Sequence, residues 1–88
     1  MIKVYGMKTC PDCSYIYDQI KDKASEYEYV EIGEHVKNLK EFLIARDNKP
    51  IFKDCKANGS VGIPYFVLED GKISLTPEDV GLKSRMEI

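Results

Sequence analysis

Two cysteines three residues apart, Cys10 and Cys13, constrain this chain most, because they stand between a strand-like segment and a helical pattern. Residues 1–6 alternate in the way that a strand does. Pro11 suits the first position of a helix, where its missing N–H is not needed. A thiol at a helix N-terminus faces free backbone N–H groups and the positive end of the helix dipole, and both favour thiolate over thiol. The segment therefore predicts a nucleophilic Cys10, with Cys13 on the same face and able to close a disulfide.

Size and charge limit the class of protein. The chain has 88 residues, which allows a single domain over residues 1–88. Its formal net charge is -2, with basic residues scattered among acidic ones, so nucleic acid is not an expected partner. No apolar run approaches the ~20 residues of a membrane helix, and the start resembles a strand rather than a signal peptide. We expect a cytoplasmic monomer with no membrane partner, in which two of the three cysteines are catalytic rather than structural.

Periodicity along the rest of the chain predicts alternating strands and helices. The expected elements, in order, are strand 1–6, helix 11–24, strand 27–32, helix 36–48, short helix 50–58, strand 63–68, strand 73–75 and a helical turn at 76–79. The helix over 36–48 is amphipathic, with these residues on its apolar face: Val36, Leu39, Phe42 and Leu43. The first strand, helix and strand form a right-handed unit with parallel strands. Asp70-Gly71 predicts a hairpin, and Thr76 is expected to cap the last turn with Asp79 as its acidic partner. This order predicts an α/β fold with a mixed four-stranded sheet flanked by helices.

Three segments carry a resemblance to the glutaredoxins. They are Tyr5–Cys13 (YGMKTCPDC), Gly62–Phe66 (GIPYF) and Asp70-Gly71, in the same order and over nearly the whole chain. The resemblance implies a thioredoxin-like fold and an enzyme, a glutathione-disulfide or protein-disulfide oxidoreductase. It implies glutathione as co-substrate, disulfide-bonded proteins as partners, no tightly bound cofactor and no metal. It also implies a cis Ile63–Pro64 bond beside the redox pair, although only about 5% of X–Pro bonds in folded proteins are cis.

The same resemblance assigns roles to individual residues. Cys10 would attack, Cys13 would resolve the mixed disulfide, and Lys8 would help to keep Cys10 ionised. As the residue further into the helix, Cys13 should be the more buried and remain a thiol. The backbone of Ile63 would pair with the cysteine of glutathione or with a substrate peptide. The residues implied in substrate binding are Thr9, Pro11, Asp12, Ile63, Pro64, Thr76, Glu78 and Asp79.

Two departures from the glutaredoxin pattern leave the electron donor open. Position 12 is Asp where many glutaredoxins have an aromatic residue, and no Gly-Gly pair follows the hairpin, where the chain reads LTPED over 75–79. A thioredoxin-like protein-disulfide reductase fed by a flavoprotein reductase is therefore an alternative. Arg46 and Lys49 are cations that a glutathione carboxylate could use, although charges at a helix end are more often solvated.

A metal centre is a further alternative for the cysteine pair. Iron–sulfur glutaredoxins usually have one active cysteine without a following proline, so Pro11 and Cys13 argue against a cluster. A zinc site needs more ligands, and Cys55 and His35 offer no second paired spacing. We expect Cys55 to be a small buried hydrophobe of its short helix and His35 to begin the helix over 36–48.

Overall fold

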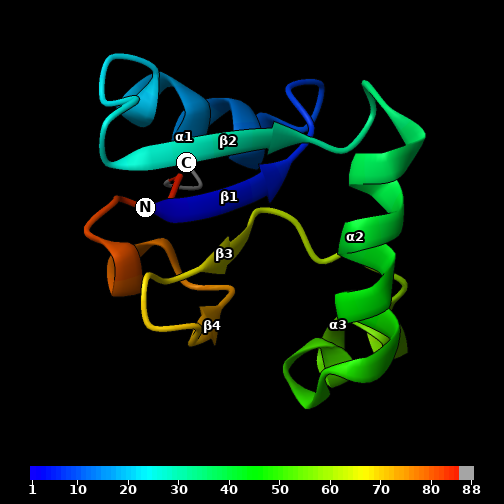
Figure 1. Cartoon of the computed structure of the whole chain (residues 1–88). Coiled ribbons are helices and arrows are strands. Elements are labelled where there is room, and N and C mark those ends of the chain that lie inside the picture. The colour runs from blue at the N-terminus through cyan, green and yellow to red at the C-terminus, as the bar shows by residue number, and fades with distance from the viewer. Residues whose placement is uncertain (86–88) are drawn as a thin grey trace.

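The fold is built on a mixed sheet of four strands in the order β2-β1-β3-β4 (Figure 1). The computed structural model describes residues 1–85. The inner strand β1 (Ile2–Gly6) runs parallel to β2 (Tyr27–Glu31) and antiparallel to β3 (Tyr65–Val67). β3 in turn pairs antiparallel with the short β4 (Ile73–Ser74). The predicted α/β class, the parallel first pair and the later hairpin are therefore confirmed.

Helices connect the strands and flank the sheet. They are α1 (Pro11–Ile20), α2 (Val36–Asn48), a 3₁₀ turn (Pro50–Phe52) that leads into α3 (Lys53–Asn58), and a last 3₁₀ turn (Pro77–Val80). Figure 1 shows α2 and α3 together at one side of the molecule, apart from α1. Over residues 1–85 no helix has the length and apolar character that crossing a membrane requires.

Apolar side chains fill two cores, because both faces of the sheet are covered. One core joins β1, β2 and β3 to α2 and the 3₁₀ turn after it, and its buried residues are Tyr5, Val30, Ile32, Phe42, Ala45, Phe52 and Tyr65. The other joins the sheet to α1 and the last 3₁₀ turn, and its buried residues are Val4, Ile16, Ile20, Phe66, Val80 and Leu82. Successive residues of a strand point to opposite faces. Val4 and Tyr5 therefore enter different cores, and β1 is buried on both sides.

Several elements are shorter than the sequence predicted. The helix expected over 11–24 ends at Ile20, and Ala24 is exposed. Turn hydrogen bonds replace the helix after that point, from Lys23 N to the Ile20 carbonyl and from Glu26 N to the Lys23 carbonyl. The chain must reverse there so that Tyr27 can pair with Ile2 at the start of the parallel ladder. The strand predicted over 63–68 is reduced to Tyr65–Val67, since Pro64 has no N–H to donate to a ladder.

The buried face of α2 and the cap of the last turn also differ from prediction. Only Phe42 and Ala45 of α2 are buried, while Val36, Leu39 and Leu43 are exposed, because this helix meets the core along a narrow edge. Thr76 makes no side-chain capping bond. Ser74 stabilises the start of this turn instead. Its Oγ accepts a hydrogen bond from Thr76 N at 2.9 Å and donates one to the Asp79 carboxylate at 2.6 Å.

The first prediction concerns the core under α2. Phe42 is 1% exposed and meets Phe52 and Tyr65 edge-on, so Phe42→Ala should lower the free energy of unfolding by about 3–5 kcal/mol. Ile44 on the same helix is 67% exposed, and Ile44→Ala should change the stability by no more than about 0.5 kcal/mol. Urea unfolding of the two variants measures the difference. Equal losses would show that α2 does not pack on the sheet through Phe42.

Candidate active site

The two cysteines occupy the first turn of α1, where their environments differ. Cys10 is the N-cap residue, with Pro11 at the first helical position and no side chain capping the helix. Its N–H donates to the Met7 carbonyl at 2.9 Å, and its own carbonyl accepts from Ser14 N at 2.9 Å. Cys10 is partly exposed, whereas Cys13 is fully buried. The expected asymmetry between an outer and an inner sulfur is present.

Burial keeps Cys13 protonated. The pKa of this thiol is raised from 9.0 to about 12, chiefly by its removal from water and also by the charge and hydrogen bond of Cys10, against the lowering effect of a backbone hydrogen bond from Met7. Desolvation is the largest of these influences, because a sulfur removed from water is more stable as the neutral thiol. The inner sulfur is therefore a neutral thiol near neutral pH.

The packing of Cys13 depends on Gly6 at the end of β1. A Cβ atom at this position would lie 3.0 Å from Cys13 Sγ, 3.2 Å from Cys13 Cβ and 2.8 Å from the Tyr29 hydroxyl. These separations are too short for van der Waals contact, so only a residue without a side chain lets α1 approach the strand this closely. In the sequence, Gly6 is marked only as the end of a strand, and no motif marks Tyr29 as a neighbour of Cys13.

Lys8 and Thr9 lie in the exposed turn before Cys10. The side-chain ammonium of Lys8 lies over the ring of Tyr17, 4.3 Å from its centroid. The backbone N–H of Lys8 donates a hydrogen bond to the Glu31 carboxylate at 2.9 Å. The ring of Tyr17 thus binds the cation that was predicted to act on Cys10. The role of Lys8 towards the thiol remains a prediction.

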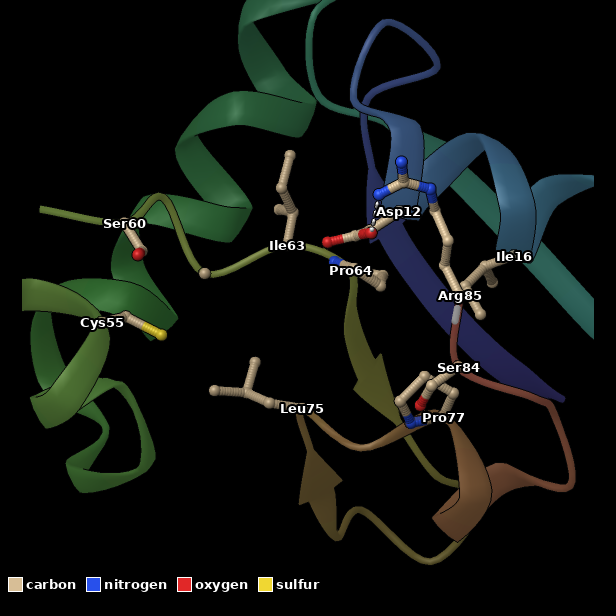
Figure 2. Close-up of a pocket in the computed structure, with 11 residues that line it drawn as sticks. Asp12, Ile16, Cys55, Ser60, Ile63, Pro64, Leu75, Pro77, Ser84 and Arg85 are labelled. Carbon is tan, nitrogen blue, oxygen red and sulfur yellow. Dashed lines mark hydrogen bonds and ion pairs between the residues drawn. The ribbon is translucent and has the colours of Figure 1, made fainter. Parts of the chain in front are cut away.

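A cavity of about 320 Å³ opens beside the proline that precedes β3 (Figure 2). The Ile63–Pro64 bond is cis, as the resemblance implies. The residues that line the cavity are Asp12, Ile16, Cys55, Ser60, Gly62, Ile63, Pro64, Leu75, Pro77, Ser84 and Arg85. We call this cavity the proline groove. Three of the predicted substrate-binding residues, Asp12, Ile63 and Pro64, therefore meet at one site.

The other predicted binding residues lie elsewhere. Pro11 and Thr76 are exposed but do not line the proline groove. The Glu78 carboxylate accepts from Ser84 N at 2.9 Å and Ser84 Oγ at 2.8 Å, and these bonds lower its pKa. Asp79 accepts from Ser74 Oγ. Both carboxylates are thus engaged in holding the segment that follows β4.

Side chains that sequence reading did not assign to binding complete the groove. Arg85 Nη1 lies 3.2 Å from an Asp12 carboxylate oxygen, so the C-terminal segment reaches the turn between the two cysteines (Figure 2). Cys55, expected to be buried, is half-buried and turns its sulfur towards the cavity (Figure 2). No sequence motif marks Arg85, because this contact depends on where the last 3₁₀ turn sends the chain.

Arg46 has a structural role that fixes one wall of the groove. Its guanidinium donates to the carbonyls of Ser60 at 2.7 Å and Val61 at 2.8 Å, which leaves it bound to the loop rather than only solvated. The ring of Phe52 fills the space beside Gly62, where an added Cβ would lie 2.7 Å from a ring carbon. Gly62 also has a φ of +97°, which disfavours other residues. The loop before Pro64 is thereby held from two sides.

A second cavity, of about 410 Å³, opens near the carboxyl ends of β1 and β2. Its lining is polar and comprises Lys8, Tyr17, Tyr29, Glu31, Glu34, His35 and Asn38. His35 begins α2 as predicted, and its Nδ1 accepts from Lys37 N at 3.1 Å. Over residues 1–85, no three His, Cys, Asp or Glu side chains gather in a way that would hold a metal ion.

Comparison with known proteins finds a relative in Haemophilus influenzae, described as an uncharacterized protein. It is 37% identical to this chain over 72 residues, which cover 82% of this chain and 84% of the relative. No family model matches the chain. No solved structure matches it either.

The buried thiol predicts a pH dependence of stability for the reduced protein. The folded state retains the Cys13 proton up to about pH 12, whereas the unfolded chain loses it near pH 9. Cys13 therefore favours the folded state below pH 9, and this contribution is lost as the pH rises through that interval. The loss has an upper limit of about 1.4 kcal/mol per pH unit.

Urea unfolding under reducing conditions between pH 8 and pH 10 measures this loss. Cys13→Ala should flatten the decline, while Cys55→Ala, at a half-buried thiol, should retain it. An equal decline in both variants would contradict a raised pKa at Cys13.

Proposed function

We propose that this chain, which belongs to the same family as the uncharacterized protein of Haemophilus influenzae, is a glutaredoxin-like thiol–disulfide oxidoreductase with a thioredoxin-like fold. The observation that carries the proposal is the pair at the start of α1, one sulfur partly exposed and the other buried. The parallel β1–β2 pair, the antiparallel β3–β4 hairpin and the cis-proline before β3 support the fold assignment. We place this activity in the cytoplasm, where thiols are kept reduced, and in a monomer.

The exposed sulfur starts the reaction. Cys10, as a thiolate, attacks one sulfur of a substrate disulfide, and the other substrate sulfur leaves as a thiolate that takes a proton from water. Cys13 then loses its proton and attacks Cys10 Sγ. A Cys10–Cys13 disulfide forms and the second substrate thiol departs. Two glutathione molecules reduce that disulfide and become oxidised glutathione, so the electrons balance.

The proline groove is the proposed site for the substrate or for glutathione. It borders the turn of the cysteines through Asp12 and presents the backbone of Ile63 next to the cis-proline. An extended peptide can pair with exposed backbone of this kind, which makes recognition depend little on its side chains. The hydroxyls of Ser60 and Ser84 and the guanidinium of Arg85 add polar groups to the rim.

A specific observation supports the alternative electron donor. Glu78 and Asp79, which the resemblance implies in the binding of glutathione, are instead bound by Ser84 and Ser74. A protein that lacks this contact would still reduce protein disulfides if a flavoprotein reductase returned its electrons. The alternative is therefore a thioredoxin-like protein-disulfide reductase with the same two cysteines.

Glutathione-dependent reduction of a small mixed disulfide, coupled to glutathione reductase, tests the proposal. Activity should be abolished in Cys10→Ser and retained in Cys13→Ser, because a second glutathione can replace the inner thiol on a monothiol route. An inactive parent that turns over a protein disulfide with thioredoxin reductase would establish the alternative. Failure in both assays, with no Cys10–Cys13 disulfide by mass spectrometry after oxidation, would refute both functions.

Arg85 provides a test of the groove. Its pair with Asp12 is exposed, and such pairs contribute roughly 0–1 kcal/mol, so the guanidinium is available to a substrate carboxylate. Arg85→Ala should raise the KM for glutathione about two- to fivefold and leave kcat nearly unchanged. Lys83→Ala is the matched control, because Gln19 holds the Lys83 backbone rather than its side chain. Equal KM values in the two variants would exclude Arg85 from binding.

A further inference from the structure

The hydroxyl of Tyr29 stands out among the buried polar groups of residues 1–85, because it has no hydrogen-bond partner. Two other tyrosine hydroxyls that are partly buried are paired: Tyr27 donates to the Val80 carbonyl at 2.8 Å and Tyr5 to the Glu41 carboxylate at 3.2 Å. Folding removes the Tyr29 hydroxyl from water without replacing the hydrogen bond that it loses. Such a group is unfavourable for stability and calls for an explanation in function.

Tyr29 is held next to the inner thiol. It pairs with Val4 in the parallel ladder and packs in the core on the α1 side of the sheet. The Tyr29 hydroxyl and Cys13 Sγ both lie close to Gly6. A Cβ atom added to Gly6 would be 2.8 Å from the hydroxyl and 3.0 Å from the sulfur. The ring of Tyr17 meets the Tyr29 ring edge-on, with centroids 5.1 Å apart. The phenol is thus fixed from α1, and the absence of a Cβ atom at Gly6 lets its oxygen and the Cys13 sulfur approach the same point.

The surroundings of the phenol make it a donor and not a base. Burial raises the pKa of Tyr29, and the charges of Cys13, Glu31, Cys10 and Tyr17 raise it further. The nearby cation, the ammonium of Lys8, lies over the ring of Tyr17. The Tyr29 hydroxyl therefore keeps its proton wherever thiols exchange.

In the reduced protein this donor has no strong acceptor. Burial keeps Cys13 a neutral thiol, and a neutral thiol accepts hydrogen bonds only weakly. A thiolate at the same position is a charged acceptor, and hydrogen bonds to ionised groups are roughly twice as strong as neutral ones. The pairing of Tyr29 thus depends on the charge state of Cys13.

We propose that the Tyr29 hydroxyl donates a hydrogen bond to Cys13 Sγ when that sulfur is negatively charged, and so assists the closing and opening of the Cys10–Cys13 disulfide. This role presupposes the thiol–disulfide exchange proposed above. In the closing step the Cys13 proton goes to water, the thiolate attacks Cys10 Sγ, and the bond from Cys10 to the substrate sulfur breaks. In the opening step an incoming thiolate bonds to Cys10, and Cys13 leaves as a thiolate before water protonates it. Tyr29 keeps its proton in both directions.

The closing step is measured directly on a chromogenic mixed disulfide. All variants carry Cys55→Ser. At acidic pH, Cys10 attacks the aromatic disulfide of 2-nitro-5-thiobenzoate, which forms a mixed disulfide on Cys10 and releases a first chromophore. Cys13 attacks this mixed disulfide only slowly at that pH. A jump to neutral or mildly alkaline pH starts the intramolecular attack, and the coloured thiolate released reports its rate. Tyr29→Phe should slow this release about tenfold at each pH, as expected for loss of a hydrogen bond to a charged group.

Two controls separate this role from a structural one. Tyr27→Phe removes a hydroxyl from the same strand, together with its bond to Val80, and should leave the release rate unchanged. Tyr29→Phe should also keep or raise the midpoint of thermal unfolding, because it removes an unpaired buried hydroxyl, while Tyr27→Phe should lower it. Iodoacetamide alkylation of Cys10 should proceed at the same rate in all of these variants.

The outcomes distinguish this inference from the proposed function. If the parent releases no second chromophore, or releases it equally after Cys13→Ser, the exchange itself fails. If the parent releases it and Tyr29→Phe does so at the same rate, the exchange stands and the role of Tyr29 is refuted. A Tyr29→Phe variant with a lower thermal midpoint and an altered Cys10 alkylation rate would show a packing residue and would likewise overturn the proposal.

Discussion

The close contact between Cys13 and Gly6 is the constraint on which the rest of the candidate site depends. It brings the first turn of α1 against the end of β1, with no room for a side chain between them. One sulfur is then inside the core and the other, three residues earlier, is at the surface. The difference in burial sets the difference in chemistry, because a thiol removed from water keeps its proton. A larger residue at position 6 would meet the Tyr29 hydroxyl and Cys13 Sγ, so at least one of these side chains would have to shift.

The proline groove is assembled from segments far apart in the sequence, and each is anchored by a different interaction. Arg46 of α2 holds the carbonyls of the loop before β3, and Phe52 fills the space beside Gly62. On the opposite side, Glu78 folds the C-terminal segment back through Ser84. Figure 2 shows Arg85 arriving from that segment to meet Asp12. The charge of Asp12, one residue before the buried thiol, is thereby paired with a cation from the C-terminal segment.

The sequence predicted the parts of the fold that depend on local pattern. The order of strands and helices, the hairpin and the ends of the helices at Asn48 and Asn58 follow from periodicity, proline and glycine. Two predictions, the end of α1 and the extent of the buried face of α2, needed further tertiary context and were wrong. α1 ends at Ile20 because the chain must turn to reach β2, and the apolar face of α2 is only partly covered. For the site, motif and resemblance identified Cys10, Cys13 and Pro64, but Tyr29 and Arg85 belong to it only through folding, and no local spacing marks them.

The unfavourable features of the structure gather around the thiols. Elsewhere the core is apolar, and its one buried polar residue, Ser74, is well hydrogen-bonded within residues 1–85. Near Cys13, in contrast, a phenol is buried without a partner and a thiol is held far from its ordinary pKa. Local departures from good packing are expected where function requires them and the remaining fold supplies enough stability. Both departures lie around Gly6, and the proposed exchange accounts for them together, because it requires negative charge to appear and disappear on the buried sulfur.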